Sequence, residues 1–229
     1  MKAECINCKN MNCYIKQYCS NHWLQIIDFK KEETFYKSGE SIFIEGVSEP
    51  GLHFIHEGKV KMTTRGLKGK QQIIRFAGNG DVLGHYCAGD EPFPIEIVAM
   101  EDSNICFIDN NILEDVLMDT PLLTIALMRY YSGELRKMES RIKQIVQMNT
   151  REKVAEALLF IIDSWGLNDS KTITLQVSRR DIADIIGITA EQVVRQLSDF
   201  EKEKMIAKIG RKISITNKRG LKNILRNYN

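Results

Sequence analysis

The chain has 229 residues, a formal net charge of +2, and a composition that is 43% hydrophobic and 27% charged. These proportions are typical of a soluble globular protein with one or two domains. No apolar run is long enough to span a membrane, and the first ten residues lack the hydrophobic stretch of a signal peptide. We therefore expect a cytoplasmic protein with no membrane partner.

The small net charge conceals an uneven distribution. From Lys171 to Asn229 there are 13 Lys and Arg residues and 6 Asp and Glu residues, a net charge of +7, whereas the remaining residues carry a net charge of −5. A basic C-terminal module on an acidic body indicates a polyanionic partner at that end.

Residues 1–22 form a short, polar segment rich in cysteine. Cys5, Cys8, Cys13 and Cys19 have the spacing C-x2-C-x4-C-x5-C. In a reducing compartment cysteines are thiols or metal ligands rather than disulfides, and four thiols so close together indicate metal ligands. Thiolates suit both zinc and iron–sulfur clusters. The alternative is a flexible tail with free thiols.

Residues 23–118 are expected to form an antiparallel β-roll. The segment contains seven strand-like runs, and ten of the fifteen glycines of the chain separate them. Short strands with turn signals at this spacing are typical of a jelly roll or barrel. The runs are ETFYK, SIFIE, LHFIHEG, KVKMTTR, QQIIRF, EIVAM and NICFID.

Residues 119–150 are expected to form a long dimerisation helix. Apolar residues recur along it at steps of three and four, which is the a/d pattern of a coiled coil. A helix that packs only on its own domain usually shows a wider apolar face, so a dimer seam is favoured over that alternative. The seam consists of Met128, Tyr131, Leu135, Met138, Ile142 and Ile145.

Residues 151–229 are expected to form a winged helix-turn-helix. Ser178 and Asp181 form a capping box that opens one helix, and Thr189 and Gln192 form a second box that opens the next. Gly187 lies at the break between them, where a left-handed backbone conformation is needed. An αα-hairpin in a helical core is the alternative, but it does not account for the register of these signals.

The second of these helices is expected to read DNA. Ile182, Ile185, Ile186, Val193, Leu197 and Phe200 form the inward stripe, which leaves polar residues near the start of the second helix on the outer face. A helix-turn-helix presents that face to the major groove. A hairpin with Gly210 at its tip follows as the wing, and the last basic segment is expected to form a short helix. The predicted DNA-binding residues are Thr189, Glu191, Gln192, Arg195, Arg179, Arg211 and Lys212.

The order of these α+β parts, and the motif GNGDVLG at 78–84, resemble the Crp/Fnr family of bacterial transcription regulators. The Fnr branch is the nearest likeness. ITAEQVVRQL (188–197) is similar to its recognition helix, RYYSGELRK (129–137) to its dimer helix, AMEDSNIC (99–106) to the segment with its central cysteine, and NCYIKQYC (12–19) to part of its N-terminal cysteine motif.

The resemblance implies a cyclic-nucleotide-binding-like roll, a homodimer, a two-fold operator in double-stranded DNA and RNA polymerase as a further partner. It implies that Glu191 and Arg195 read bases, which agrees with their chemistry, since arginine pairs with guanine and glutamate accepts from cytosine. It also implies that Cys106 completes a metal site with three N-terminal cysteines. Alternatively, the four N-terminal cysteines close a site alone and Cys106 is a buried strand residue.

Four departures from the family bear on the signal. The segment GHYCAGDEPFPIEI (84–97) lacks the arginine that holds a cyclic phosphate, so cyclic AMP is not expected. Asn10 lies where the Fnr branch has a ligand, so Cys8 or Cys5 must substitute. Met138 replaces an acidic residue in the seam, which favours a dimer in any metal state. Val194 replaces a serine of the recognition helix, which changes the expected operator.

The sequence therefore predicts a homodimeric, sequence-specific transcription regulator that responds to redox state or oxygen through a cysteine-bound metal, either a 4Fe–4S cluster or zinc. The alternative is a small-molecule or haem sensor that uses His53, His56 or His85 of the roll, with the cysteines holding structural zinc. Cys87 is expected to be incidental. An enzyme is not expected, since no nucleophile–base pair, phosphate loop or catalytic carboxylate pair stands out.

Overall fold

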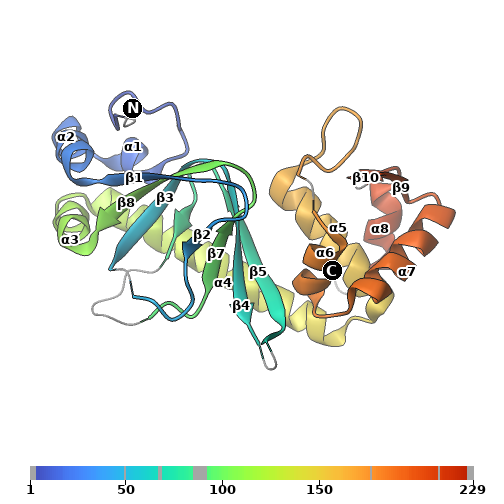
Figure 1. Cartoon of the computed structure of the whole chain (residues 1–229). Coiled ribbons are helices and arrows are strands. Elements are labelled where there is room, and N and C mark those ends of the chain that lie inside the picture. The colour runs from blue at the N-terminus through green and yellow to red at the C-terminus, as the bar shows by residue number, and fades with distance from the viewer. Residues whose placement is uncertain are drawn as a thin grey trace. The chain divides into compact units, whose positions relative to one another are not determined.

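The computed structural model of the chain describes residues 4–48, 50–66, 69–84, 92–175, 177–210 and 212–225 (Figure 1). The chain forms two compact units. The first consists of Met1–Leu67 and Ile74–Arg136, and the second of Lys68–Ile73 and Lys137–Asn229. Within the described ranges, no helix is both long and apolar enough to cross a membrane.

The first unit contains the predicted antiparallel roll. Its strands form two four-stranded sheets, with the orders β1-β8-β3-β6 and β2-β7-β4-β5. Between the sheets lies an apolar core that includes Ile55, Val60, Leu83, Ile97 and Ile105. The strands are β1 (Glu32–Tyr36), β2 (Ser41–Phe43), β3 (Gly51–Glu57), β4 (Lys59–Arg65), β5 (Gln71–Gly78), β6 (Val82–Leu83), β7 (Glu96–Ala99) and β8 (Ser103–Asp109).

A second core covers the other face of the β1-β8-β3-β6 sheet. Side chains alternate between the two faces of a strand, so Phe54 points away from the core that holds Ile55. Phe54 instead packs with Ile15 of α1 (Tyr14–Tyr18), Ile27 of α2 (Asn21–Lys30) and Leu113 of α3 (Asn110–Asp119). Figure 1 shows these three helices beside that sheet.

The N-terminal segment is therefore part of the fold. The expected boundary at residue 22 falls inside α2, and α1 lies within the cysteine-rich segment that the sequence left without structure. Ile15, Leu24 and Ile27 are each no more than 3% exposed. Burying such side chains stabilises a fold by about 1.5–3 kcal/mol each, so the sheet holds the cysteines in fixed positions.

The long helix α4 (Pro121–Gln147) begins at a proline, which is tolerated in a first helical turn because its missing N–H would have no partner there. The second unit continues with α5 (Thr150–Trp165), α6 (Arg179–Ile186), α7 (Ala190–Lys202), β9 (Ile206–Ile209), β10 (Lys212–Ile215) and α8 (Lys218–Ile224). Helix α5 packs against α6, α7 and α8. The predicted wing hairpin and the predicted terminal helix are both confirmed.

Gly80, in the motif GNGDVLG, lies against the cysteine segment, so a substitution there tests how that segment docks. Its φ is +90°, and an added Cβ would lie 2.4 Å from the Cβ of Asn12 and 2.8 Å from its carbonyl carbon. Gly46 is a matched control, because its φ is +89° but no atom lies within 4 Å of an added Cβ. Both substitutions introduce backbone strain of about 1 kcal/mol, and only Gly80→Ala adds a clash, which costs a further 1–3 kcal/mol, roughly.

We expect Gly80→Ala to lower the free energy of unfolding by more than Gly46→Ala, and to expose the chain before Tyr14 to proteases. Urea unfolding and limited proteolysis measure the two effects. Equal losses in the two variants would contradict this docking.

Candidate DNA-binding surface and cysteine cavity

Both predicted capping boxes are present at the helix-turn-helix. The Asp181 N–H donates to Ser178 Oγ (3.0 Å) and the Ser178 N–H donates to Asp181 Oδ2 (3.0 Å), so the first turn of α6 is closed on both sides. Gly187 ends α6 with φ +69° and ψ +30°, the left-handed conformation that glycine adopts at least cost.

The N-cap of helix α7, Thr189, lies two residues after Gly187 and has the same arrangement. The Gln192 N–H donates to Thr189 Oγ1 (3.3 Å), and the Thr189 N–H donates to Gln192 Oε1 (3.0 Å). Both side chains thus stabilise the helix start, with a contribution of about 1 kcal/mol that is typical of such caps. Four residues near the start of α7 were predicted to bind DNA. Thr189 and Gln192 form the capping box, and Glu191 and Arg195 are exposed and take no part in it.

The predicted inward stripe is confirmed. Each of its six residues in α6 and α7 is at most 1% exposed, whereas Val194 is 50% exposed on the opposite face, between Glu191 and Arg195. Hydrogen bonds from its own backbone N–H and from the Thr189 hydroxyl lower the pKa of Glu191, so it is an anion at neutral pH. The exposed start of α7 therefore presents an anionic acceptor, an apolar side chain and a cationic donor.

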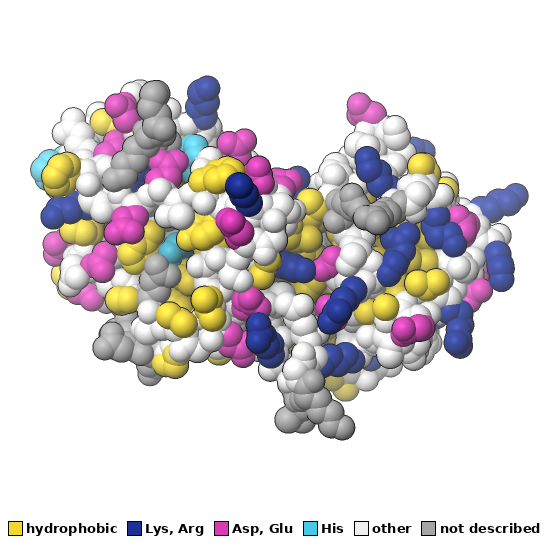
Figure 2. Space-filling model, viewed as in Figure 1, with side chains coloured by type: hydrophobic (Ala, Val, Ile, Leu, Met, Phe, Trp, Pro, Cys, Tyr) yellow, Lys and Arg dark blue, Asp and Glu magenta, His cyan; other side chains and the backbone are white. Residues whose placement is uncertain are grey.

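Further basic side chains belong to the same unit. Figure 2 shows Lys and Arg side chains gathered over the C-terminal unit. Lys212 is exposed on β10 of the wing, and Arg179 is half-buried in the first turn of α6, where burial lowers its pKa. Arg211 lies outside the described residues. Lys208 of β9 pairs with Glu201 (2.8 Å), which ties the wing to α7.

Two arginines hold the helix-turn-helix in place. Arg151 of α5 binds both oxygens of Glu203 just after α7 (2.7 and 2.6 Å). Arg141, in the last turns of α4, donates to the Ile185 carbonyl (2.8 Å) and lies over the Phe160 ring, 4.1 Å from its centroid. The end of the long helix is thus bonded directly to α6 within the second unit.

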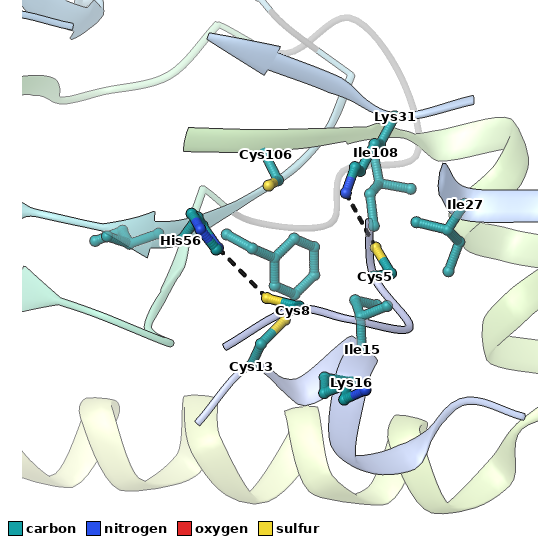
Figure 3. Close-up of a pocket in the computed structure, with 12 residues that line it drawn as sticks. Cys5, Cys8, Cys13, Ile15, Lys16, Ile27, Lys31, His56, Cys106 and Ile108 are labelled. Atoms are coloured by element: carbon teal, nitrogen blue, oxygen red, sulfur yellow. Dashed lines mark hydrogen bonds between the residues drawn. The ribbon is translucent and has the colours of Figure 1, made fainter. Parts of the chain in front are cut away.

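Four cysteines line one cavity of the first unit. Figure 3 shows Cys5, Cys8 and Cys13 entering it from the N-terminal segment and Cys106 from β8. The sequence predicted a contribution from Cys106 only through the family resemblance. Cys19 packs against the same apolar core but does not line this cavity.

Asn10 anchors the cysteine segment to β3. Its side-chain amide donates to the carbonyls of Ile55 (2.9 Å) and His56 (2.8 Å), so the position where the Fnr branch has a ligand serves here as a backbone clamp. The clamp holds Cys8 beside the strand, where its Sγ lies 3.4 Å from His56 Nδ1.

Burial keeps most of these thiols protonated. It raises the pKa of Cys5 and Cys106 to about 12 each, and it raises the pKa of Cys13 as well. Cys19, outside the cavity, is also raised to a pKa of about 12 by burial. Thiols bind metals as thiolates, so a metal that enters the cavity must displace protons.

A buried lysine stands beside Cys5. The Lys31 side chain is 3% exposed, and its Nζ lies 3.2 Å from Cys5 Sγ and 3.1 Å from Asp28 Oδ1. Burial by itself would lower the pKa of Lys31, but its electrostatic interactions with Cys5 and Cys106 and its hydrogen bonds to Cys5 and Asp28 raise it above its ordinary value. The sequence did not predict that Lys31 is buried, because it follows Lys30 at the end of a helix, where a lysine is usually exposed to solvent.

The two described histidines of the roll differ in their surroundings. His56 lines the cysteine cavity, whereas His53 is buried between the rings of Phe43 and Phe107, with centroids 4.3 and 4.5 Å away. His85 and Cys87 lie outside the described residues, as does half of the segment that lacks the phosphate-binding arginine.

A polar network connects the cysteine segment to α4. Tyr14, next to Cys13, packs edge-on against Tyr130 of α4 (5.4 Å between centroids). The Tyr130 hydroxyl accepts from the Val82 N–H (3.1 Å) and from Arg75, and Arg75 Nε pairs with Glu134 (2.7 Å). The network was not visible in the sequence, because its members come from distant elements.

The predicted dimer seam is largely exposed in the single chain. Met128 is 65% exposed, Leu135 58%, Met138 40% and Ile142 63%, and Leu122 and Ile125 extend the stripe toward the start of α4. Tyr131 and Ile145 are half-buried, and the Tyr131 hydroxyl donates to the Gly84 carbonyl (3.3 Å). An apolar stripe of this length on a long helix is typical of a surface that another helix covers.

Comparison with known proteins agrees with both units. Residues 33–120 match the model of the cyclic nucleotide-binding domain, and residues 152–224 match that of the Crp-like helix-turn-helix domain. Together with the geometry of α6 and α7, these matches define a DNA-binding transcription regulator.

The chain belongs to the Crp/Fnr family. It is 28% identical over 221 residues to the fumarate and nitrate reduction regulatory protein of Escherichia coli strain K12, covering 93% of this chain and 87% of that protein. The structure of FixK2 from Bradyrhizobium japonicum is 27% identical in sequence and has a TM-score of 0.74. The similarity covers 85% of this chain and 96% of that one. CLP from Xanthomonas campestris has a TM-score of 0.75 at 14% identity, which shows the fold alone. Since these relatives are transcription regulators, the prediction that the chain is not an enzyme is confirmed.

Proposed function

We propose that this regulator is a homodimer that binds a two-fold operator and responds to redox state or oxygen through a metal centre held by Cys5, Cys8, Cys13 and Cys106. The observation that carries the proposal is the single cavity that these four thiols line, although they come from two parts of the chain 93 residues apart.

The chemistry of these residues fits a thiolate-bound centre. Four sulfur donors in a largely apolar pocket, with Ile15, Phe54 and Ile108 around them, suit an iron–sulfur cluster or zinc. Among the described residues, no three cysteine, histidine or carboxylate side chains are already arranged as ligands of one ion. Binding must therefore draw the thiols together and remove their protons.

An iron–sulfur cluster at this place would supply reversible electron transfer and sensitivity to oxidants, and zinc would supply structure alone. The likeness to the fumarate and nitrate reduction regulator favours the cluster. The residues of the chain do the rest. They partly bury the sulfurs, hold the cysteine segment on β3 through Asn10, and contact α4 through Tyr14.

This last contact offers a route for the signal. Cys13 and Tyr14 are neighbours, so a movement of the Cys13 sulfur on metal binding shifts the ring that packs on Tyr130. Tyr130 and Arg75 in turn fix the α4 turn that carries Glu134. Leu135 of the proposed dimer seam directly follows Glu134. The metal state can thereby bias how two copies of α4 meet.

We expect the cysteines of the cavity, and not Cys19, to be required for the metal. Protein purified without oxygen should contain either iron with sulfide or about one zinc per chain. Cys13→Ser and Cys106→Ser should each lose the metal. Cys19→Ser should retain it, because Cys19 is a thiol whose pKa is also raised by burial but which lies outside the cavity. Elemental analysis and visible absorption measure this. Metal-free wild-type protein with full DNA binding would reject the centre, and loss of metal in Cys19→Ser would assign it to another ligand set.

The dimer should form with or without metal, because Met138 keeps the seam apolar. Met138→Asp places facing carboxylates in the seam and should weaken the dimer by about 3 kcal/mol, more than a hundredfold in its dissociation constant. Ser140→Asp adds the same charge to an exposed position outside the seam and should change little. Sedimentation of the metal-free proteins gives the result. A wild-type monomer at micromolar concentration would instead support control by dimerisation.

Glu191 and Arg195 should read bases from the exposed start of α7. Arg195→Ala should cost roughly 1–3 kcal/mol per contact and relax the preference at one base pair of each half-site. Lys212→Ala in the wing should weaken binding to all sequences alike and reduce the salt slope by about one. Selection from random DNA at fixed salt separates the two effects. If Arg195→Ala selects the wild-type site, a different face of α7 meets the bases.

A further inference from the structure

Lys31 differs from the other basic residues of the first unit. At 3% exposure it is the one lysine among the buried polar residues of the described chain, and its ammonium reaches into the cysteine cavity. Burial of an ammonium is costly unless it is paired, so a lysine at this place needs an anionic partner. Figure 3 shows its Nζ directed at the sulfur of Cys5, and the two atoms are 3.2 Å apart.

The partners of Lys31 are not placed symmetrically. Asp28, at 3.1 Å, has a side chain that is 22% exposed, so water screens its charge more than that of Lys31. The carboxylate of Asp28 also accepts the backbone N–H of Cys5 at 2.5 Å, which fixes the start of the cysteine segment. The ammonium of Lys31 is thus the more deeply buried of the two charges beside the Cys5 thiol, and the carboxylate of Asp28, which also contacts that thiol, is closer to solvent.

We propose that Lys31 is a positioning residue of the metal centre, whose positive charge offsets the excess negative charge that thiolate ligands bring into the cavity. The inference rests on the proposed centre with Cys5 as a ligand. A divalent ion with four thiolates leaves uncompensated negative charge in an apolar pocket, where Coulomb interactions are stronger than in water. An ammonium beside one of the sulfurs stabilises that state, and a neutral side chain of the same length does not.

Residues that contact the ligands of a metal site typically change its affinity for the metal by about 10–100-fold when they are mutated. Lys31→Met should therefore weaken metal binding by at least tenfold, roughly, whereas Lys31→Arg, which keeps the charge, should stay within about threefold of wild type. Asp28→Asn is the matched opposite. Asn still accepts the N–H of Cys5 but removes a negative charge, so metal binding should be unchanged or tighter.

The experiment titrates the full-length, reduced protein with Co²⁺ in the absence of oxygen and follows the absorption of the cobalt–thiolate bonds. Urea unfolding of each variant checks that it is folded. Lys31→Gln, which can still donate to Asp28, serves as a second neutral variant and should bind Co²⁺ as weakly as Lys31→Met.

Weaker Co²⁺ binding in Lys31→Met, with unchanged or tighter binding in Asp28→Asn and recovery in Lys31→Arg, would support the inference. Wild-type affinity in the neutral variants would overturn it and leave the metal centre in place. Equal weakening in Lys31→Met and Asp28→Asn would also overturn it, because the ion pair would then only hold the segment together. If wild type and Cys8→Ser take up Co²⁺ equally poorly, the proposed centre itself fails, and the role of Lys31 fails with it.

Discussion

The packing of the cysteine segment against the β1-β8-β3-β6 sheet is the interaction on which the cavity depends. Ile15 and Ile27 are buried with Phe54 and Ile108, and this core brings Cys5, Cys8 and Cys13 to the cavity that Cys106 also lines. Without it, these thiols would belong to a chain end of ordinary flexibility. The same burial raises the thiol pKa values, so the cavity resists ionisation until a cation is present to replace the protons.

Arginines that bond across elements attach the long helix at its middle and near its C-terminal end. In the first unit Arg75 holds Glu134 and Tyr130, and in the second unit Arg141 holds the Ile185 carbonyl at the end of α6. Buried, charge-assisted bonds of this kind are stronger than neutral ones and fix geometry as well as distance. Leu135 and Met138 of the exposed apolar stripe lie between these two anchors along α4, so the proposed dimer contact shares this helix with both sets of bonds.

The departures of this chain from the Fnr pattern fit one another. Asn10 serves as a clamp on β3 rather than as a ligand, and Cys5 and Cys8 occupy the cavity. Cys5 brings Lys31 and Asp28 with it, so the site gains a buried ion pair. Met138 removes the acidic residue from the seam. We infer a regulator in which the metal controls the arrangement of a standing dimer rather than its assembly.

Local sequence determined the helix-turn-helix, because caps, a left-handed glycine and the apolar period act within a few residues, and all of them appear in α6 and α7 as predicted. The strands, the wing and the long helix were predictable for the same reason. Only the tertiary structure decided which cysteines share a cavity, that Cys19 is outside it, and that Lys31 is buried beside Cys5. These facts depend on the pairing of β3 with β8 and on the docking of α1 and α2, and contacts between residues so far apart along the chain leave no periodic trace in it.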